Sequence, residues 1–353
     1  MKKRIKYFYL ILSSLLVIAS CKNSSDSGLV KTVENGVEKW FYEDDYLKQK
    51  PEQIELKELF VIGQLDGDTN YVFSYITNFD IDRQGNIFLY DYGMKKISKF
   101  SRDGKFVTSF CYYGGGPGEA KNVGILKAMD EFILVYDYAL DRISQFAFNG
   151  SFVNSYQLNS FNRIKRSKTV RGHIEGIYPM LDNNYVFGFE KTDQVNAKNF
   201  VTYYYDKDKS ADMDSLFSIS IPINVLRSKD GAAGIYSNLK LDCIKINRDR
   251  FLCSFSENYE LKIYDKNGKL CKIIIRKYNR QHYSSAEKEA ANKRAVFVID
   301  GKKIYRELPK FKQDIQGIFF DDQNKILVLT STGNENDGYL YDIYDEDGKW
   351  VKL

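Results

Sequence analysis

The chain has 353 residues, 43% of them hydrophobic and 28% charged, so it is long enough and apolar enough to bury a core. Its 5 prolines exclude a Pro-rich disordered chain, and a formal net charge of +5 is too small for this length to indicate a nucleic-acid partner. The 27 tyrosines and 24 phenylalanines favour pleated, half-buried surfaces, and the composition therefore predicts an all-β fold.

The first 21 residues, MKKRIKYFYLILSSLLVIASC, have the pattern of a secretory signal. Four basic residues precede an apolar run over residues 7–18, which is short for a membrane span. The last four letters, IASC, resemble the lipobox of bacterial lipoproteins. That resemblance implies cleavage after a signal peptide of residues 1–20 and acylation of Cys21, and several acyl chains anchor a protein stably.

Residues 21–28, CKNSSDSG, are polar and are predicted to form a flexible tether. An aspartate directly after the lipidated cysteine would indicate retention in the inner membrane. Lys22 stands there instead, so we expect a lipid anchor in the outer membrane of the cell envelope. The sequence does not distinguish the periplasmic side from the surface side.

The remainder, residues 29–353, contains a repeat. NIFLYDYGMKKISKFSRDGKFVTSF (86–110) aligns with FILVYDYALDRISQFAFNGSFVNSY (132–156) at an offset of 46 positions. A fixed period of this size is typical of repeat architectures. The local signals are short strands joined by polar turns, and four antiparallel strands in about 45 residues fit one blade of a β-propeller. The matched pairs are Asp91 with Asp137, Ile97 with Ile143, Phe100 with Phe146 and Gly104 with Gly150.

Five blades can be read from the sequence. Each has a polar turn followed by an apolar strand, and the strands open at Ile87, Ile133, Tyr185, Phe251 and Ile326. The growing spacing between these residues predicts insertions, at residues 163–173 and 227–238, and a short helix near residues 284–297 with Ser284 or Ser285 as its cap.

A hairpin is also predicted in residues 31–42, around Asn35-Gly36, which is the strongest short hairpin signal. We expect it to contribute to a sixth blade and to close the ring with the C-terminal strands. Six blades are the prediction, and five remain the alternative.

The stretch YYGGGPGE (112–119) combines backbone freedom with a proline. It falls between the last strand of one blade and the first strand of the next. A phosphate-binding loop would end in Lys-Ser or Lys-Thr and open a helix, whereas Glu119-Ala120 and a further strand follow here. The sequence therefore predicts an inter-blade hinge made by Gly114, Gly115, Gly116, Pro117, Gly118 and Glu119.

The run DIDRQGNIFLYD, the hairpin ISKFSRDGKF and the linker GGGPGE together resemble the six-bladed, NHL-related β-propeller lipoproteins of Gram-negative anaerobes. The resemblance is strong over residues 79–161 and weaker over residues 181–353. It implies a propeller architecture and an envelope location. It says little about activity, and the short C-terminus leaves the mode of ring closure open.

Few residues carry recognisable chemistry. The two histidines have no partner at metal-ligand spacing, and no nucleophile motif appears, so we assign no catalytic residue, metal or cofactor. The basic run of residues 163–171 supplies candidate binding residues for an anionic ligand, Arg166 and Arg171 with His173 beside them, although such runs are often only solvated loops. The cysteines after the tether lie in strand-like contexts and are expected to be buried thiols, at Cys111, Cys243, Cys253 and Cys271.

Two functions remain open at this point. The first is a membrane-anchored, non-catalytic binding module whose partner is an envelope protein, a glycan or a peptide. The alternative is a propeller enzyme of the lactonase, hydrolase or lyase type with a site at the central channel. Metal content separates them, because stoichiometric calcium or zinc would favour the enzyme.

Overall fold

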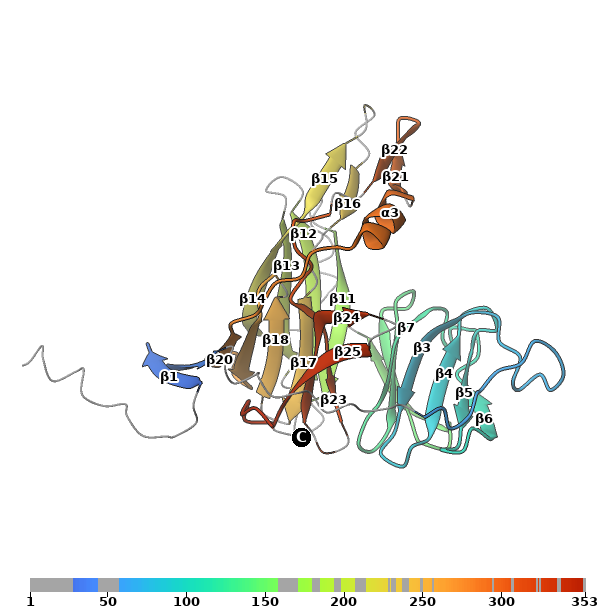
Figure 1. Cartoon of the computed structure of the whole chain (residues 1–353). Helices are drawn as coiled ribbons and strands as arrows, with labels where there is room; N and C mark the ends of the chain where they lie inside the picture. The colour runs from blue at the N-terminus through green and yellow to red at the C-terminus, as the bar shows by residue number, and fades with distance from the viewer. Residues whose placement is uncertain are drawn as a thin grey trace, which may run out of the picture. The chain divides into compact units, whose positions relative to one another are not determined.

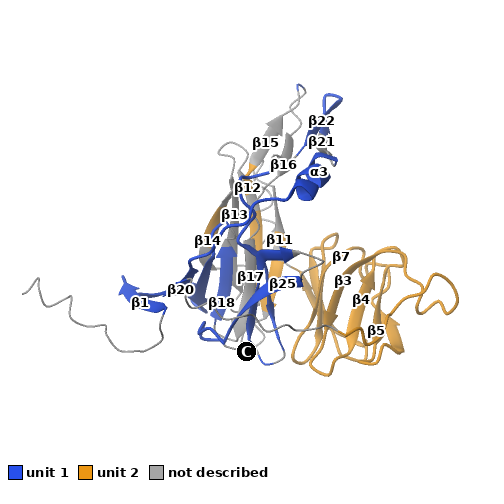
Figure 2. Ribbon diagram, in the orientation of Figure 1, with its two compact units in different colours: residues 1–52, 224–353 blue, residues 53–223 orange. Residues whose placement is uncertain are grey.

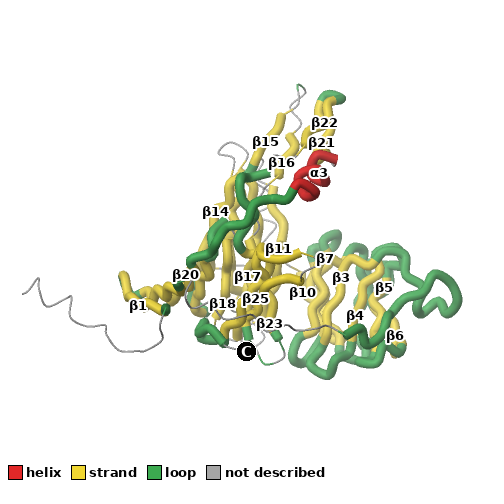
Figure 3. The backbone as a smooth tube through the Cα atoms, viewed as in Figure 1, coloured by secondary structure: helices red, strands yellow, loops and turns green. Residues whose placement is uncertain are grey.

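The structure, a computed structural model, divides into two compact units, one of residues 53–223 and one of residues 1–52 with 224–353 (Figure 2). Strands dominate both units, and one short helix lies among the described residues (Figures 1 and 3). The all-β class is therefore confirmed. The described residues are 28–43, 57–157, 171–179, 185–193, 198–206, 214–227, 229, 233–236, 241–247, 250–255, 257–293, 295–305, 308–321, 323, 325–334 and 338–351.

The unit of residues 53–223 contains three four-stranded antiparallel sheets, each a meander of consecutive strands. The first sheet holds β3 (Ile76–Ile81), β4 (Ile87–Asp91), β5 (Lys96–Phe100) and β6 (Phe106–Phe110). The second holds β7 (Val123–Ala128), β8 (Ile133–Asp137), β9 (Arg142–Phe146) and β10 (Phe152–Gln157). The third holds β11 (Arg171–Pro179), β12 (Tyr185–Asp193), β13 (Lys198–Asp206) and β14 (Asp214–Pro222).

The other unit contains a fourth such meander, a three-stranded sheet and three hairpins. The meander is β17 (Leu241–Asn247), β18 (Arg250–Phe255), β19 (Glu260–Asp265) and β20 (Leu270–Arg276), and the three-stranded sheet is β23 (Ile315–Phe320), β24 (Ile326–Asn334) and β25 (Gly338–Tyr344). The hairpins pair β1 (Leu29–Glu34) with β2 (Val37–Tyr42), β15 (Asn224–Arg227) with β16 (Ala233–Tyr236), and β21 (Ala295–Ile299) with β22 (Lys302–Tyr305).

The repeat in the sequence matches these sheets strand for strand. Ile87, Ile133, Tyr185 and Ile326 are the first residues of β4, β8, β12 and β24, and Phe251 is the second residue of β18. Each of these strands is the second in its run of consecutive antiparallel strands. Four-stranded antiparallel meanders repeated along a chain are the arrangement of propeller blades. The blade-like repeat is thus confirmed, while the count of six blades stays a prediction.

The N-terminal hairpin forms at the predicted turn, where Asn35 and Gly36 both have positive φ, 53° and 78°. Its partner differs from the prediction. β2 runs parallel to β20 and so widens the sheet of β17–β20, instead of pairing with the C-terminal strands. The hairpin does touch the C-terminal segment through a side chain, because the Tyr42 hydroxyl accepts a hydrogen bond from the Trp350 amide at 3.1 Å.

The predicted helical insertion is confirmed but is shorter than expected. The helix α3 (Ser285–Lys293) begins after a capping box, in which Ser284 N donates to Glu287 Oε2 at 2.7 Å and Glu287 N donates to Ser284 Oγ at 3.2 Å. It ends four residues before position 297, because the run AVFVI (295–299) consists mostly of β-branched and aromatic residues and forms the strand β21 instead.

In each of the first two sheets, a buried carboxylate at the end of the second strand binds the backbone that leads into the first strand. Asp91, the last residue of β4, accepts hydrogen bonds from the backbone amides of Ser74, Tyr75, Gly93 and Met94 at 2.7–3.0 Å. Asp137, 46 positions later, accepts from Lys121, Asn122, Ala139 and Leu140 at 2.6–3.3 Å. Burial alone would raise the pKa of Asp91, but the four N–H donors outweigh it and lower that pKa.

The four cysteines after the tether lie in strands or directly after one, as expected. Cys111 and Cys253 are buried, as expected, and Cys271 is partly exposed, while the side chain of Cys243 lies outside the described residues. Burial raises the pKa of the Cys111 thiol to about 12, and the negative charge of Asp137 adds to the rise while Arg142 opposes it. Cys111 is therefore a small apolar side chain at physiological pH.

Candidate functional site

The glycine-rich segment of residues 112–119 connects β6 with β7, and the chain continues into a strand, not a helix. Its backbone is tied at both ends, because Ala120 N donates to Tyr112 O at 2.9 Å and Gly114 N donates to Ala120 O at 3.2 Å. Gly118 has a φ of 77°, which favours glycine. The Glu119 carboxylate folds back onto the loop and accepts a hydrogen bond from Gly116 N at 2.8 Å.

One buried arginine holds this segment. The Arg142 guanidinium, at the start of β9, donates to the carbonyl oxygens of Gly115 at 3.0 Å, Gly116 at 3.1 Å and Glu119 at 2.5 Å. Pro117 stands between these anchor points and is exposed. The segment is therefore a fixed connection between two sheets, and the protein itself supplies donors to the carbonyl oxygens of Tyr112, Gly115, Gly116 and Glu119.

The basic candidates from the sequence are only partly described. Arg166 and Cys21 lie outside the described residues. Arg171 and His173 lie in β11, where His173 is opposite Glu190 in the antiparallel register. The side chains of both residues lie outside the described part of the structure. The hypothesis of an anion site at Arg166, Arg171 and His173 stays a prediction.

A pocket of about 140 Å³ lies in the unit of residues 1–52 and 224–353. Sequence reasoning did not single it out. Two segments that flank α3 and the β21–β22 hairpin form it, together with the turn before β19. The lining residues are Glu257, Arg280, Pro309, Lys310, Phe311 and Gln313.

Cations lie against an aromatic ring in this pocket. The guanidinium carbon of Arg280 is 5.0 Å from the centre of the Phe311 ring, and Lys310 Nζ is 5.1 Å from the same centre. The His282 ring packs against Phe311 at a tilt of 37° with ring centres 4.5 Å apart, and its Nδ1 lies 3.1 Å from Lys310 O. A cation within about 6 Å of an aromatic centre is attracted to the ring face. The pocket therefore combines an apolar floor with positive charge.

Arg280 is held in place, whereas Lys310 is exposed. The Arg280 side chain donates from Nε to Asp314 Oδ1 at 3.1 Å and from Nη2 to Glu257 O at 2.7 Å. Burial raises the pKa of Asp314, and the positive charge of Arg280 opposes that rise. Because Asp314 neutralises Arg280, the ammonium group of Lys310 is the cation best placed to meet a ligand.

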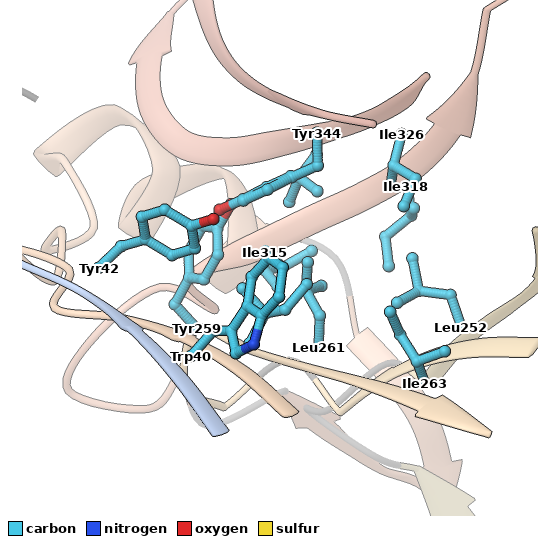
Figure 4. Close-up of a cluster of buried hydrophobic side chains, with 12 residues drawn as sticks. Trp40, Tyr42, Leu252, Tyr259, Leu261, Ile263, Ile315, Ile318, Ile326 and Tyr344 are labelled. Atoms are coloured by element: carbon cyan, nitrogen blue, oxygen red, sulfur yellow. The ribbon is translucent and has the colours of Figure 1, made fainter. Parts of the chain in front are cut away.

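Asp314 also connects the pocket to a buried polar network. Its Oδ2 accepts a hydrogen bond from Tyr259 N at 3.1 Å, and the hydroxyls of Tyr259 and Tyr344 are 2.9 Å apart. The hydroxyl of Tyr42 points toward that of Tyr344 in Figure 4, within a cluster of buried side chains from β2, β18, β19, β20 and β23–β25. Burial raises the pKa of Tyr259 and Tyr344 well above the usual value for tyrosine, so both stay neutral donors.

A buried ion pair completes this network. Arg276, at the end of β20, pairs with Asp342 in β25, and their side chains are 7% and 2% exposed. Burial alone would lower the pKa of Arg276, but the carboxylate of Asp342 raises it. The guanidinium lies 5.3 Å from the Tyr259 ring and 5.2 Å from the Tyr278 ring, so aromatic faces surround the charge. This pair is inaccessible to a ligand and holds together the elements that carry the pocket.

The described residues include no group of three or more His, Cys, Asp or Glu side chains that could hold a metal ion. Within the same ranges, no helix is both long enough and apolar enough to cross a membrane.

Comparison with known proteins found similar structures but no family. No protein-family model matches the sequence, and no curated protein matches it. A member of the DUF4221 family from Bacteroides vulgatus is similar over 80% of each chain, with 9% identity and a TM-score of 0.45. A Bacteroides fragilis protein described as exported is similar over 94% of this chain and 77% of its own, with 12% identity and a TM-score of 0.39.

An inactive virginiamycin B lyase from Staphylococcus aureus, bound to quinupristin, is a third similar structure. It matches 79% of this chain and 69% of its own, with 10% identity and a TM-score of 0.32. At such identities and TM-scores, the three similarities assign neither a family nor an activity to this chain.

Proposed function

We propose that the protein is an envelope lipoprotein, anchored to the outer membrane through acylated Cys21, whose propeller binds a ligand or a protein without catalysing a reaction. The same proposal takes the sheets as blades of a six-bladed ring of the NHL-related type. The signal pattern of residues 1–21 supports the anchor. The repeat of meander sheets supports the ring.

The pocket at Phe311 is the observation that carries the binding role. Its volume of about 140 Å³ is small beside the ~300–1,000 Å³ of ordinary small-molecule sites. It therefore suits one functional group at the end of a ligand. The ammonium of Lys310 and the apolar faces of Phe311 and Pro309 fit a carboxylate attached to a flat apolar group. Glu257 also lines the pocket and disfavours ligands with two negative charges.

Binding of an aromatic monocarboxylate is expected at this pocket. Benzoate at ten times its Kd should stabilise the protein against unfolding by about 1.4 kcal/mol, measured as a shift in thermal midpoint. Benzamide, which has the same shape and no charge, should not. Lys310→Met should weaken benzoate binding about tenfold, which corresponds to the loss of one charged contact. Lys288→Met, which removes an exposed lysine on α3, is the matched control. Equal stabilisation by benzamide, or unchanged affinity in Lys310→Met, would contradict the pocket's role.

The anchor is tested separately in a Gram-negative host. The full chain should incorporate radioactive palmitate and sediment with the outer-membrane fraction, because acylated Cys21 is embedded there. Cys21→Ser should lose both the label and the sedimentation, whereas Cys271→Ser should keep them. Label retained in Cys21→Ser, or a wild-type protein free of membranes, would show that the anchor is wrong.

A further inference from the structure

Five exposed tyrosines lie beside strand ends at the same end of the first two sheets in the unit of residues 53–223. Tyr75 precedes β3 and Tyr92 follows β4, and the Tyr92 amide donates to Tyr75 O at 2.8 Å. Tyr138 follows β8, 46 positions after Tyr92, and its amide donates to Asn122 O at 3.0 Å. Tyr112 and Tyr113 follow β6. We call these five residues the tyrosine rim.

Strand register places the residues of the rim at one end of the two sheets. Ile76 at the start of β3 is opposite Asp91 at the end of β4, and Val123 at the start of β7 is opposite Asp137 at the end of β8. The two sheets lie side by side with the same sense, because Asn78 contacts Val123 O at 3.5 Å and Ala128 N donates to Asp80 at 2.9 Å. The strand ends that carry the rim therefore face the same way.

The five tyrosines are exposed to solvent, although Tyr138 also packs on Gly124 and on the Tyr136 ring. The exposed fractions are 64% for Tyr75, 41% for Tyr92, 55% for Tyr112, 63% for Tyr113 and 40% for Tyr138. Large exposed apolar surface that is concentrated in one place marks an interaction site. Each ring presents an apolar face and a polar tip, which suits a partner that has both kinds of surface.

Two lysines lie beside the rim, and the carboxylates near it are buried or partly buried. Lys95 Nζ lies 3.3 Å from the centre of the Tyr92 ring, and Lys121 is exposed beside Gly115. The carboxylates at this end of the sheets accept hydrogen bonds from groups of the protein itself. Asp91 and Asp137 are each saturated by four backbone amides, Glu119 is bound by Gly116 N, and Asp141 accepts from the Tyr136 hydroxyl at 2.8 Å.

We propose that the tyrosine rim binds an acidic polysaccharide, with sugar rings stacked on the tyrosines and uronate carboxylates paired with Lys95 and Lys121. Carbohydrate rings have apolar C–H faces and polar edges, which match the two surfaces of a tyrosine. Tyrosines are also enriched in the cores of protein interfaces, but lysines are depleted there, so the combination fits a protein partner less well. Several weak contacts spread over two sheets suit a repeating polymer, whose adjacent units bind together.

This proposal does not depend on the pocket at Phe311, which belongs to the other unit. The full chain should bind polygalacturonate in affinity electrophoresis, and binding should weaken as salt rises. It should bind neither dextran, which has sugar rings without charge, nor polyglutamate, which has charge without sugar rings. Tyr75→Ala and Tyr113→Ala should each weaken binding about tenfold, the loss expected for one stacked ring.

Tyr339→Ala is the matched control, because Tyr339 is 54% exposed and belongs to the other unit. It should leave binding unchanged, and circular dichroism should show all three variants folded. Unaltered affinity in Tyr75→Ala and Tyr113→Ala would overturn the proposal. So would equal binding of polyglutamate, which would indicate an acidic protein partner, or failure of polygalacturonate, alginate and heparin alike.

Discussion

Replacing Asp342 with leucine is expected to lower the free energy of unfolding by about 3–5 kcal/mol, the largest effect of any single substitution considered for this chain. The change leaves the guanidinium of Arg276, which is 7% exposed, without its counter-charge among the rings of Tyr259 and Tyr278. An uncompensated buried charge costs much more than the pair itself contributes. Urea titration followed by tryptophan fluorescence measures the change.

The two tryptophans of the chain report on this region directly. Trp40 belongs to the same buried cluster, and Trp350 packs against it with its ring centre 5.4 Å from that of Tyr344. The double variant Arg276→Met with Asp342→Leu removes both charges and should recover most of the loss. A single variant as stable as the wild type, or a double variant less stable than Asp342→Leu, would contradict the role of the pair.

Asp137→Ala is expected to destabilise the unit of residues 53–223 by about 2–4 kcal/mol, because four backbone amides lose their acceptor together. Asp91→Ala should have a similar effect, since Asp91 has the same set of partners in the preceding sheet. Asn at either position keeps one oxygen acceptor and should cost less. Circular dichroism during urea unfolding, with hydrogen exchange of the freed amides, measures these differences.

The control for Asp137→Ala and Asp91→Ala is an exposed carboxylate of the same unit. Asp130 forms an ion pair with Arg83 at 2.8 Å, and the two side chains are 49% and 74% exposed. Ion pairs in water contribute about 0–1 kcal/mol, so Asp130→Ala should leave stability nearly unchanged. If Asp137→Ala were as mild as Asp130→Ala, the buried carboxylate would not be what closes the sheet.

The sheets could be predicted from the sequence because their signals are local and repeated. A polar turn followed by an apolar run marks the second strand of each sheet, and the 46-residue offset links Asp91 to Asp137 without reference to any contact. The helix α3 was predictable for the same reason, since its capping box needs only Ser284 and Glu287.

Pairing over long distances could not be predicted. Asn35-Gly36 determines the hairpin of β1 and β2, but nothing in those strands specifies β20, which is more than 200 positions away. The edge of a sheet accepts any strand with free backbone groups, so the choice depends on what else is buried. Here Tyr42 enters the cluster with Tyr344 and Trp350, and that contact accompanies the parallel pairing.

The pocket was missed because its residues are unremarkable one by one. Arg280 and Phe311 are 31 positions apart, and they meet only because the chain between them leaves the sheet to form α3 and the hairpin β21–β22. Their segments are joined by Lys312 N, which donates to Gln281 O at 2.7 Å. The sequence signal is weak: Phe311 follows Lys310 directly, but the aromatic residues nearest Arg280 in its segment are Tyr278 and Tyr283, two and three positions away.

The carboxylates of Asp91 and Asp137 have a consequence for how this chain tolerates change. Each one links the end of the second strand to the start of the first strand in the same sheet, so these hydrogen bonds lie within one repeat. A duplicated repeat would therefore contain both the carboxylate and the amides that bind it, and would not depend on the neighbouring repeat for this contact. The two sheets that carry these carboxylates have the shortest spacing, 46 positions between Ile87 and Ile133, and the longer spacings come later in the chain.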